Sequence, residues 1–165
     1  MSSRELEPTV QQSILDRLID LEPGVRADPP VSWNESVRRL RNALLRDLDW
    51  LLNTRRIAQP APAGFPEVQA SVYHFGLPDI TSFSGDSTET PEMLRRRIED
   101  AIRIFEPRLT GVNVVAADAG ADMRHRIRFT IDGLLRMEPN PERVTFDTVL
   151  EIGSGEFSVL GDENG

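Results

Sequence analysis

The chain contains no cysteine, no lysine and only two histidines among its 165 residues. The lack of cysteine excludes disulfides, thiol catalysis and cysteine-ligated zinc, and two histidines leave little for a histidine-based metal site. We therefore expect no metal centre and no cofactor. All 19 basic residues are arginines, whose guanidinium groups favour bidentate contacts with carboxylates. The net charge of -8 argues against nucleic acid as a partner.

Long hydrophobic runs are also absent. No apolar stretch approaches the roughly 20 residues of a membrane span, and the opening MSSRELEP lacks the apolar core of a signal peptide. We therefore expect a cytoplasmic protein that does not insert into a membrane. The length and the 39% hydrophobic fraction are typical of one soluble domain. We place that domain at residues 13–152, between a polar tail at 1–12 and a C-terminal strand or loose tail at 153–165.

Three segments have the apolar spacing of helices that are buried on one face. The first, TVQQSILDRLID, predicts a short docked helix. The second begins at the capping box of Ser32 and Glu35, and the third begins at Thr90 as N-cap with Pro91 at the first helical position. The predicted buried positions are Val10, Ile14, Leu18 and Leu21 in the first helix, Trp33, Val37, Leu40, Leu44, Leu48 and Leu51 in the second, and Ile98, Ala101, Ile102 and Phe105 in the third.

After residue 109 the apolar period changes to two, which is typical of strands. Alternating positions at 112–117, 127–137 and 144–152 predict three strands, and Phe157 and Val159 suggest a short fourth. The piece SVYHFGLPDITSF predicts a short strand or turn folded onto the core. The fold class is therefore α+β, with about three helices packed on a small three- or four-stranded antiparallel sheet. The strand at 144–152 is expected to be an exposed edge, which is either covered or open to a partner's strand.

The third helix ends at Glu106-Pro107-Arg108. Pro107 has no N–H to continue the helix and biases Glu106 away from helical backbone angles. A carboxylate at a helix C-terminus lies against the negative end of the helix dipole, so Glu106 needs a cation beside it. That cation is either an arginine of this chain, which makes an internal brace, or an arginine of another protein. Nearby arginines would keep Glu106 ionised, which suits an ion pair and not a general acid.

Motifs of catalysis are missing from the sequence. It has no glycine-rich phosphate loop, no nucleophile elbow and no histidine next to a serine in a recognisable arrangement. We expect no enzymatic activity and no small-molecule substrate. The competing class, an enzyme acting on peptidoglycan, would be signalled by turnover of cell-wall substrate that stops when one carboxylate is removed.

Four motifs together resemble a known family. They are SILDRLID, LLNTRR at 51–56, YHFGLPD, and EPR within IFEPRLTGVNV. In this order, over about residues 13–152, they look like TssE, the type VI secretion baseplate subunit related to the small wedge protein of contractile phage tails. That family is often labelled lysozyme-like. We discount the label, because the residues show no acid pair fit for sugar cleavage.

The resemblance implies a structural wedge component that joins other baseplate subunits to the sheath subunits of a contractile apparatus, on the inner face of the inner membrane. In that family the EPR tripeptide is associated with assembly contacts, which carries over onto Glu106, Pro107 and Arg108. The residues Asn53, Arg55 and Arg56 support either internal packing or a wedge contact. Two alternatives stay open: a wedge protein of another phage-tail-like contractile particle, and a soluble regulatory adaptor of the same fold.

Overall fold

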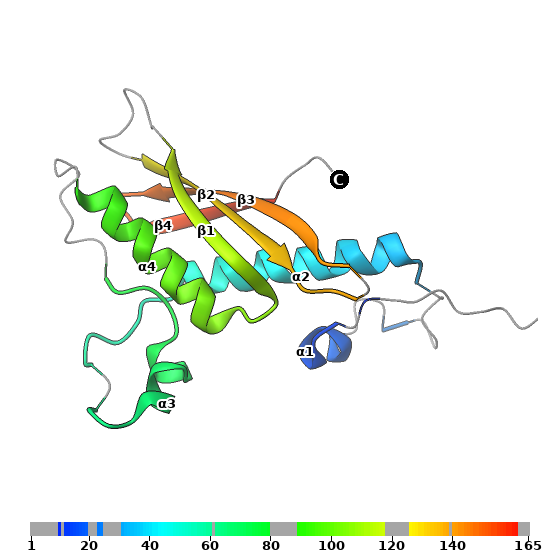
Figure 1. The fold of residues 1–165 in the computed structure, drawn as a ribbon, viewed down its shortest axis with the longest axis horizontal. Helices are drawn as coiled ribbons and strands as arrows, with labels where there is room; N and C mark the ends of the chain where they lie inside the picture. The colour runs from blue at the N-terminus through cyan, green and yellow to red at the C-terminus, as the bar shows by residue number, and fades with distance from the viewer. Residues whose placement is uncertain are drawn as a thin grey trace, which may run out of the picture.

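Helices come first along the chain and strands follow, as Figure 1 shows for the computed structural model. The structure describes residues 10, 12–19, 23–24, 31–60, 62–79, 89–117, 126–138 and 140–161. Within these residues the elements are α1 (Ile14–Leu18), α2 (Trp33–Asn53), α3 (Pro66–Gln69), the 3₁₀-helix η1 (Val72–His74), α4 (Glu89–Phe105), β1 (Leu109–Ala117), β2 (Arg126–Leu135), β3 (Glu142–Glu151) and β4 (Glu156–Gly161). The predicted α+β class is confirmed.

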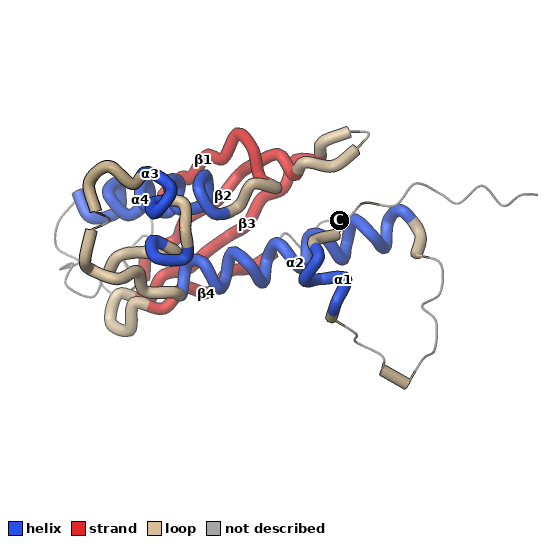
Figure 2. The backbone as a smooth tube through the Cα atoms, turned by 90° about the horizontal axis from the view of Figure 1, so that it is seen from below, coloured by secondary structure: helices blue, strands red, loops and turns tan. Residues whose placement is uncertain are grey.

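The four strands form one antiparallel sheet in the order β1-β2-β3-β4. Each strand pairs with its neighbour in sequence, so Val114 lies opposite Ile131, and Leu150 lies opposite Phe157. Helices α2 and α4 cover one face of this sheet, as Figures 1 and 2 show, with α4 against β1 and α2 against β4.

The core lies between the sheet and the two long helices. The Ser32 side chain caps α2 by accepting from the Glu35 N–H at 3.3 Å, as the capping motif predicts. Leucines at four-residue steps of α2 are buried in the same core cluster as alternating residues of β2 and β3. The fully buried side chains include Leu44, Leu48, Leu51, Leu94, Ile98, Ile102, Phe129, Ile131, Leu135 and Leu150.

The prediction that the strand at 144–152 lies at an edge of the sheet is wrong. This stretch is β3, which pairs with β2 on one side and β4 on the other, so the open edges are β1 and β4. A tight turn allows the return: Gly155 has φ +70°, and its N–H donates to the Glu151 carbonyl at 2.8 Å. The fourth strand suggested by Phe157 and Val159 is present.

The first helix does not dock through its apolar face. Val10 is buried, but Ile14 and Leu18 are 77% and 75% exposed, because α1 is short and lies on the core through its polar residues. The piece from 71 to 77 is a 3₁₀ turn and not a strand. Leu77 is buried there, whereas Val72 is 91% exposed.

Helix α4 begins at Glu89, one residue before its predicted N-cap. The predicted capping by the Thr90 side chain lies outside what the structure describes. So do most of the N-terminal tail, much of the predicted linker at 22–31, residues 80–88, residues 118–125 and the last four residues. No helix in the described ranges has both the length and the apolar character needed to cross a bilayer.

Candidate functional site

The EPR turn, Glu106–Arg108, joins the last turn of α4 to the start of β1. The Glu106 N–H donates to the Ile102 carbonyl at 2.8 Å, and the Leu109 N–H donates to the Glu106 carbonyl at 3.1 Å. The Arg108 carbonyl accepts from the Arg136 N–H at 2.8 Å, which ties the turn to the end of β2. The backbone of the turn is therefore fixed at both ends.

Glu106 and Arg108 form an ion pair inside this turn. The Glu106 side chain is only 5% exposed. Its Oε1 accepts from the Arg108 backbone N–H at 3.1 Å and from Nε at 2.7 Å, and its Oε2 accepts from Nη2 at 2.5 Å. This is the bidentate geometry that makes arginine–carboxylate pairs strong. The buried carboxylate is thus answered by a cation two residues along the chain.

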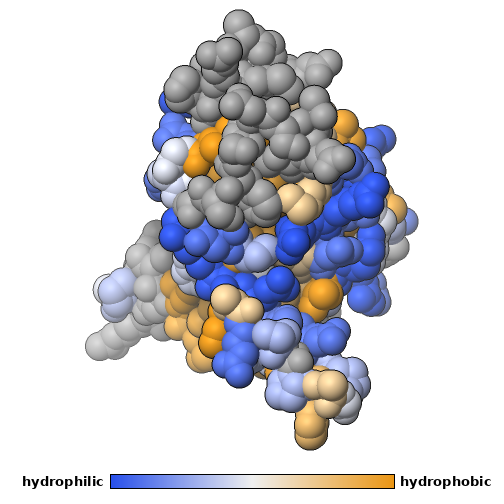
Figure 3. Space-filling view, turned by 90° about the vertical axis from the view of Figure 1, so that its left-hand side faces the viewer, coloured by the Kyte–Doolittle hydropathy of each residue, from blue (hydrophilic) through white to orange (hydrophobic). Residues whose placement is uncertain are grey.

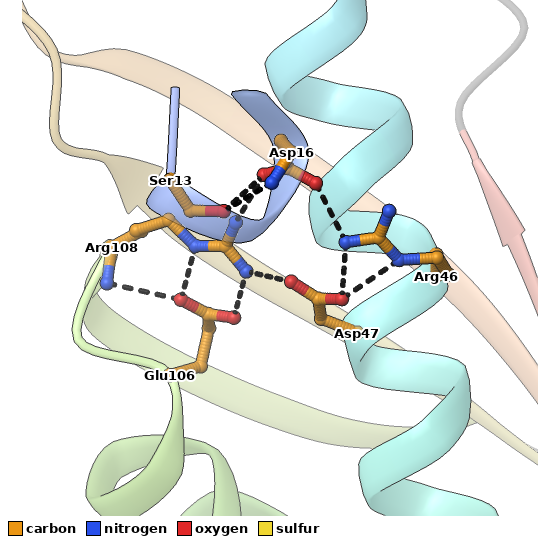
Figure 4. Close-up of polar contacts among 6 residues, drawn as sticks. All are labelled: Ser13, Asp16, Arg46, Asp47, Glu106 and Arg108. Carbon is orange, nitrogen blue, oxygen red and sulfur yellow. Dashed lines mark hydrogen bonds and ion pairs between the residues drawn. The ribbon is translucent and has the colours of Figure 1, made fainter. Parts of the chain in front are cut away.

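The pair extends into a cluster that reaches two other elements (Figure 4). Arg108 Nη2 also donates to Asp47 Oδ2 of α2 at 2.6 Å, and Asp47 Oδ1 accepts from Arg46 Nη2 at 2.8 Å. Arg46 Nη2 in turn donates to Asp16 Oδ1 of α1 at 2.8 Å. The ion-pair cluster consists of Ser13, Asp16, Arg46, Asp47, Glu106 and Arg108.

The electrostatics favour the charged form of each group with a shifted pKa. The hydrogen bond with Glu106 is the main cause that holds the pKa of Arg108 above its ordinary value, against the effect of burial. Burial disfavours the Asp16 carboxylate, but hydrogen bonds from Ser13 and Arg46 outweigh it and lower the Asp16 pKa. The cluster contains three carboxylates and two guanidinium groups. The two guanidinium charges are therefore balanced within the cluster, and no cation is left in excess.

One guanidinium nitrogen of Arg108 lacks a hydrogen-bond acceptor among the described residues. Its Nη1 is buried without a hydrogen bond, with the Asp16 carboxylate 3.9 Å away. The side chain is 22% exposed, and Pro107 is exposed beside it. Glu106 thus uses both oxygens inside the chain, while Pro107 and a small part of the Arg108 side chain remain at the surface.

The sequence left open whether the cation beside Glu106 belongs to this chain or to another protein, and the structure contains the internal pair with Arg108. The sequence pattern missed the cluster's other members. Arg46 and Asp47 lie on the charged side of α2, which is most simply interpreted as a solvated face. Asp16 carries no local signal for its ion pairs, because its arginine partners are 30 or more positions away in the sequence.

The residues of LLNTRR lie at the end of α2 and just beyond it. Asn53 Nδ2 donates to the Phe157 carbonyl at 2.9 Å, and Asn53 Oδ1 accepts from the Phe157 N–H at 2.8 Å. Arg55 Nη2 donates to the Ser154 carbonyl at 3.2 Å, at the turn between β3 and β4. The Arg56 N–H donates to the Leu77 carbonyl at 2.7 Å. Among the residues the structure describes, no hydrogen bond or ion pair joins this motif to the EPR turn.

Polar side chains also cap both edges of the sheet. Asn53 occupies the outward backbone groups of Phe157 on β4, and Arg95 Nη1 of α4 donates to the Val114 carbonyl on β1 at 3.3 Å. Such caps limit unwanted pairing at an edge. Each covers one position of its strand.

One protein family matches this chain. The family of the baseplate wedge protein gp25 matches residues 38–140, which is more than half of the sequence. The match includes most of α2, the LLNTRR motif and the EPR turn. No curated protein matches the chain significantly. The chain therefore belongs to the family of the baseplate wedge protein gp25 and is a structural component of a phage-tail-like baseplate, in contact with other baseplate components.

Proposed function

We propose that this protein is the TssE-type wedge subunit of a bacterial type VI secretion system. In this role it links the baseplate to the contractile sheath, is needed for sheath assembly and works on the cytoplasmic face of the inner membrane. Support comes from the motifs SILDRLID, LLNTRR, YHFGLPD and EPR, which occur in the order of that family. The match to the baseplate wedge family supports the same role.

The observation that carries the sheath link is the pair of strand edges at β1 and β4. Both backbone groups of Phe157 point to Asn53 and away from β3. Outward backbone groups alternate along an antiparallel strand. The N–H and C=O of Val159 on β4 therefore point outward like those of Phe157. On β1, the N–H and C=O of Ala116 point outward like those of Val114. Extended arms of sheath subunits would add as strands at these positions, with affinity from backbone hydrogen bonds.

The EPR turn would fix the orientation of such a complex. Glu106 braces the turn from inside, and this holds Pro107 and the exposed part of Arg108 in one position. Charge pairs at an interface contribute mainly to register and specificity. Glu106, Pro107 and Arg108 would therefore act as one unit at an assembly contact, with Glu106 acting through Arg108.

We propose further that the protein has no enzymatic activity, despite the lysozyme-like family label. Glu106 is the most buried carboxylate of the described chain, and it accepts three hydrogen bonds from Arg108. A general acid in sugar cleavage must give a proton to the substrate, whereas both oxygens of Glu106 are engaged by donors of Arg108 inside the chain. Incubation with peptidoglycan should release no fragments above the level of a heat-inactivated sample.

Capture of partners from the native cell tests the proposal. Tagged wild type should recover baseplate subunits together with sheath subunits. Ala116→Pro and Val159→Pro each remove an outward N–H without removing a ladder bond to the neighbouring strand. Loss of sheath subunits in one of these variants, with an unchanged unfolding midpoint, would identify the edge that receives the sheath.

Other results separate the alternatives. Recovery of tail proteins of a phage-derived particle would replace the secretion system with that particle. Recovery of one small soluble protein would favour the regulatory adaptor. A folded wild-type chain that recovers neither baseplate nor sheath subunits would overturn the proposal.

A further inference from the structure

A cationic surface lies away from the ion-pair cluster, between the end of α4 and the turn that follows η1. The surface is hollowed by a pocket of about 540 Å³. Figure 3 shows the end of the molecule that carries α3, where hydrophilic side chains are interspersed with apolar ones. The residues that line the pocket and carry the argument are Arg56, Leu77, Arg97, Asp100, Ile104 and Phe105.

Arg56 and Arg97 differ from the other arginines around them. On α4, Arg95 pairs with Glu92 and Glu99, and Arg96 pairs with Glu92. Arg56 and Arg97, in contrast, have no carboxylate partner among the residues that the structure describes. The Nε of Arg97 is buried without any hydrogen bond. A buried guanidinium nitrogen without an acceptor is costly, and no described carboxylate offsets the charge of Arg97, so this cation favours an incoming carboxylate.

The fold holds Arg56 in place at the pocket. Its N–H donates to the Leu77 carbonyl, and the Leu77 N–H donates to the Thr54 carbonyl at 2.9 Å, which makes a short parallel bridge. Gly76 permits this approach with φ +98°, since a Cβ there would lie 2.2 Å from the Thr54 oxygen. The backbone that carries Arg56 therefore needs no reordering when a ligand binds, which favours affinity.

An apolar surface lies beside the two cations. Leu77 is 3% exposed beneath the pocket, Phe105 packs edge-on against Phe75 at 5.3 Å between ring centroids, and Ile104 is 48% exposed. One acid, Asp100, also lines the pocket, and Arg103 lies 3.4 Å from its carboxylate. The arginines thus outnumber the acid in a chain whose net charge is -8.

These features select one kind of ligand. Two unpaired guanidinium groups fit carboxylates, and the exposed Ile104 fits an apolar side chain next to them. The overall negative charge disfavours a polyanionic nucleic acid. We propose that this pocket docks an acidic segment of a partner protein, in which carboxylates bind Arg56 and Arg97 and a neighbouring apolar side chain covers Ile104. Only the identity of that partner, another baseplate subunit, rests on the proposed function.

The test uses the full chain, labelled with ¹⁵N, and a short blocked peptide with four glutamates around one leucine. The Nε–H signals of Arg56 and Arg97 should shift and saturate as the peptide is added. The same peptide with glutamine in place of glutamate should leave them unchanged. The double variant Arg56→Gln plus Arg97→Gln should bind the acidic peptide roughly tenfold more weakly or worse, since charged hydrogen bonds are lost.

A matched control removes two charges elsewhere. Arg128→Gln plus Arg136→Gln makes the same charge change at exposed positions on β2 and just beyond its end, and this variant should bind as the wild type does. Both double variants should keep the wild-type unfolding midpoint, because neither pair takes part in an ion pair within the described structure.

Three outcomes would overturn the inference. They are no shift at Arg56 and Arg97, an equal loss of binding in the control variant, and an equal response to inorganic phosphate, which would make the pocket a general anion site. The peptide test involves no baseplate protein. If the peptide does not bind but the wild-type chain still captures baseplate subunits, the inference about this pocket is wrong and the proposed function stands.

Discussion

The side-chain amide of Asn53 forms two hydrogen bonds with the backbone of Phe157, one to its carbonyl at 2.9 Å and one from its N–H at 2.8 Å. The Asn53 amide thus makes the two hydrogen bonds that the backbone of a further strand would make with Phe157 at the edge of β4. This contact links two segments that lie 104 positions apart in the sequence. It fixes β4 against the helix and caps one position of the sheet edge.

Asn53→Asp should destabilise the fold by about 1 to 3 kcal/mol, because a carboxylate oxygen would then face the Phe157 carbonyl and leave it without its donor. The new charge would also lie next to Asp49, whose Oδ1 now accepts from Asn53 at 3.1 Å. Urea denaturation of both proteins measures the difference. The control Asn34→Asp makes the same change in the exposed first turn of α2, where the helix dipole favours an acid. An equal loss in both variants would show that the contact with Phe157 adds no stability.

Gly76→Ala should be among the most damaging small substitutions in the chain. Alanine disfavours φ +98°, and its Cβ would meet the Thr54 carbonyl oxygen at 2.2 Å. We expect a loss of more than about 2 kcal/mol in the free energy of unfolding. Gly64→Ala is the matched control, since Gly64 also has a positive φ of +88° but has open space around it. If the two variants lose equal stability, the close approach to Thr54 has no energetic role.

Glu106 and Arg108 should be energetically coupled. Arg108→Ala leaves the buried Glu106 carboxylate without its cation, at a cost of about 3 kcal/mol, whereas Glu106→Ala should cost less because Arg108 keeps its ion pair with Asp47. The double variant should cost clearly less than the sum, with a coupling energy of at least about 1 kcal/mol in a denaturation cycle. The pair Arg126 and Glu151, with side chains 55% and 50% exposed, is the exposed comparison, where coupling should stay below about 0.5 kcal/mol. Additive losses at Glu106 and Arg108 would contradict the internal brace.

Local patterns predicted the core and most of the strands. Leu44 and Leu48 on α2, like Phe129 and Ile131 on β2, are fully buried as their spacing indicates, because burial of one face follows directly from helical or strand period. The EPR turn was also visible, since Pro107 ends a helix by its own chemistry.

Contacts between distant segments could not be predicted in this way. Asp47 lies 61 positions from Arg108, and no spacing rule links them. The burial of a predicted helix face depends on what it meets, so the period of Ile14 and Leu18 did not reveal that both are exposed. The glycines around β4 weakened the sequence signal of the short fourth strand, so the local pattern did not show that the open edge is β4 and not β3.

The attachment of α1 should depend on pH through Asp16. The pKa of Asp16 is lowered in the folded protein, because hydrogen bonds from Ser13 and Arg46 outweigh the opposing effect of burial. A lowered pKa means that the ionised form adds stability above the pKa of about 3.9 in the unfolded chain, and that this stability is lost as the pH falls through the folded pKa. The stability gap between the wild type and Asp16→Asn should therefore be constant from about pH 5 to 7 and should shrink below about pH 4.

Urea denaturation of both proteins over this pH range measures the gap, and carboxyl-carbon NMR of Asp16 reports its titration directly. Glu67→Gln on α3 is the control, because Glu67 is exposed and takes part in no ion pair within the described residues. Its effect on stability should be small at every pH. A gap for Asp16→Asn that stays constant down to pH 3 would show that the contacts of Asp16 do not depend on its charge. The attachment of α1 would then rest on Val10, which is buried and whose N–H donates to Ser36 Oγ at 3.2 Å.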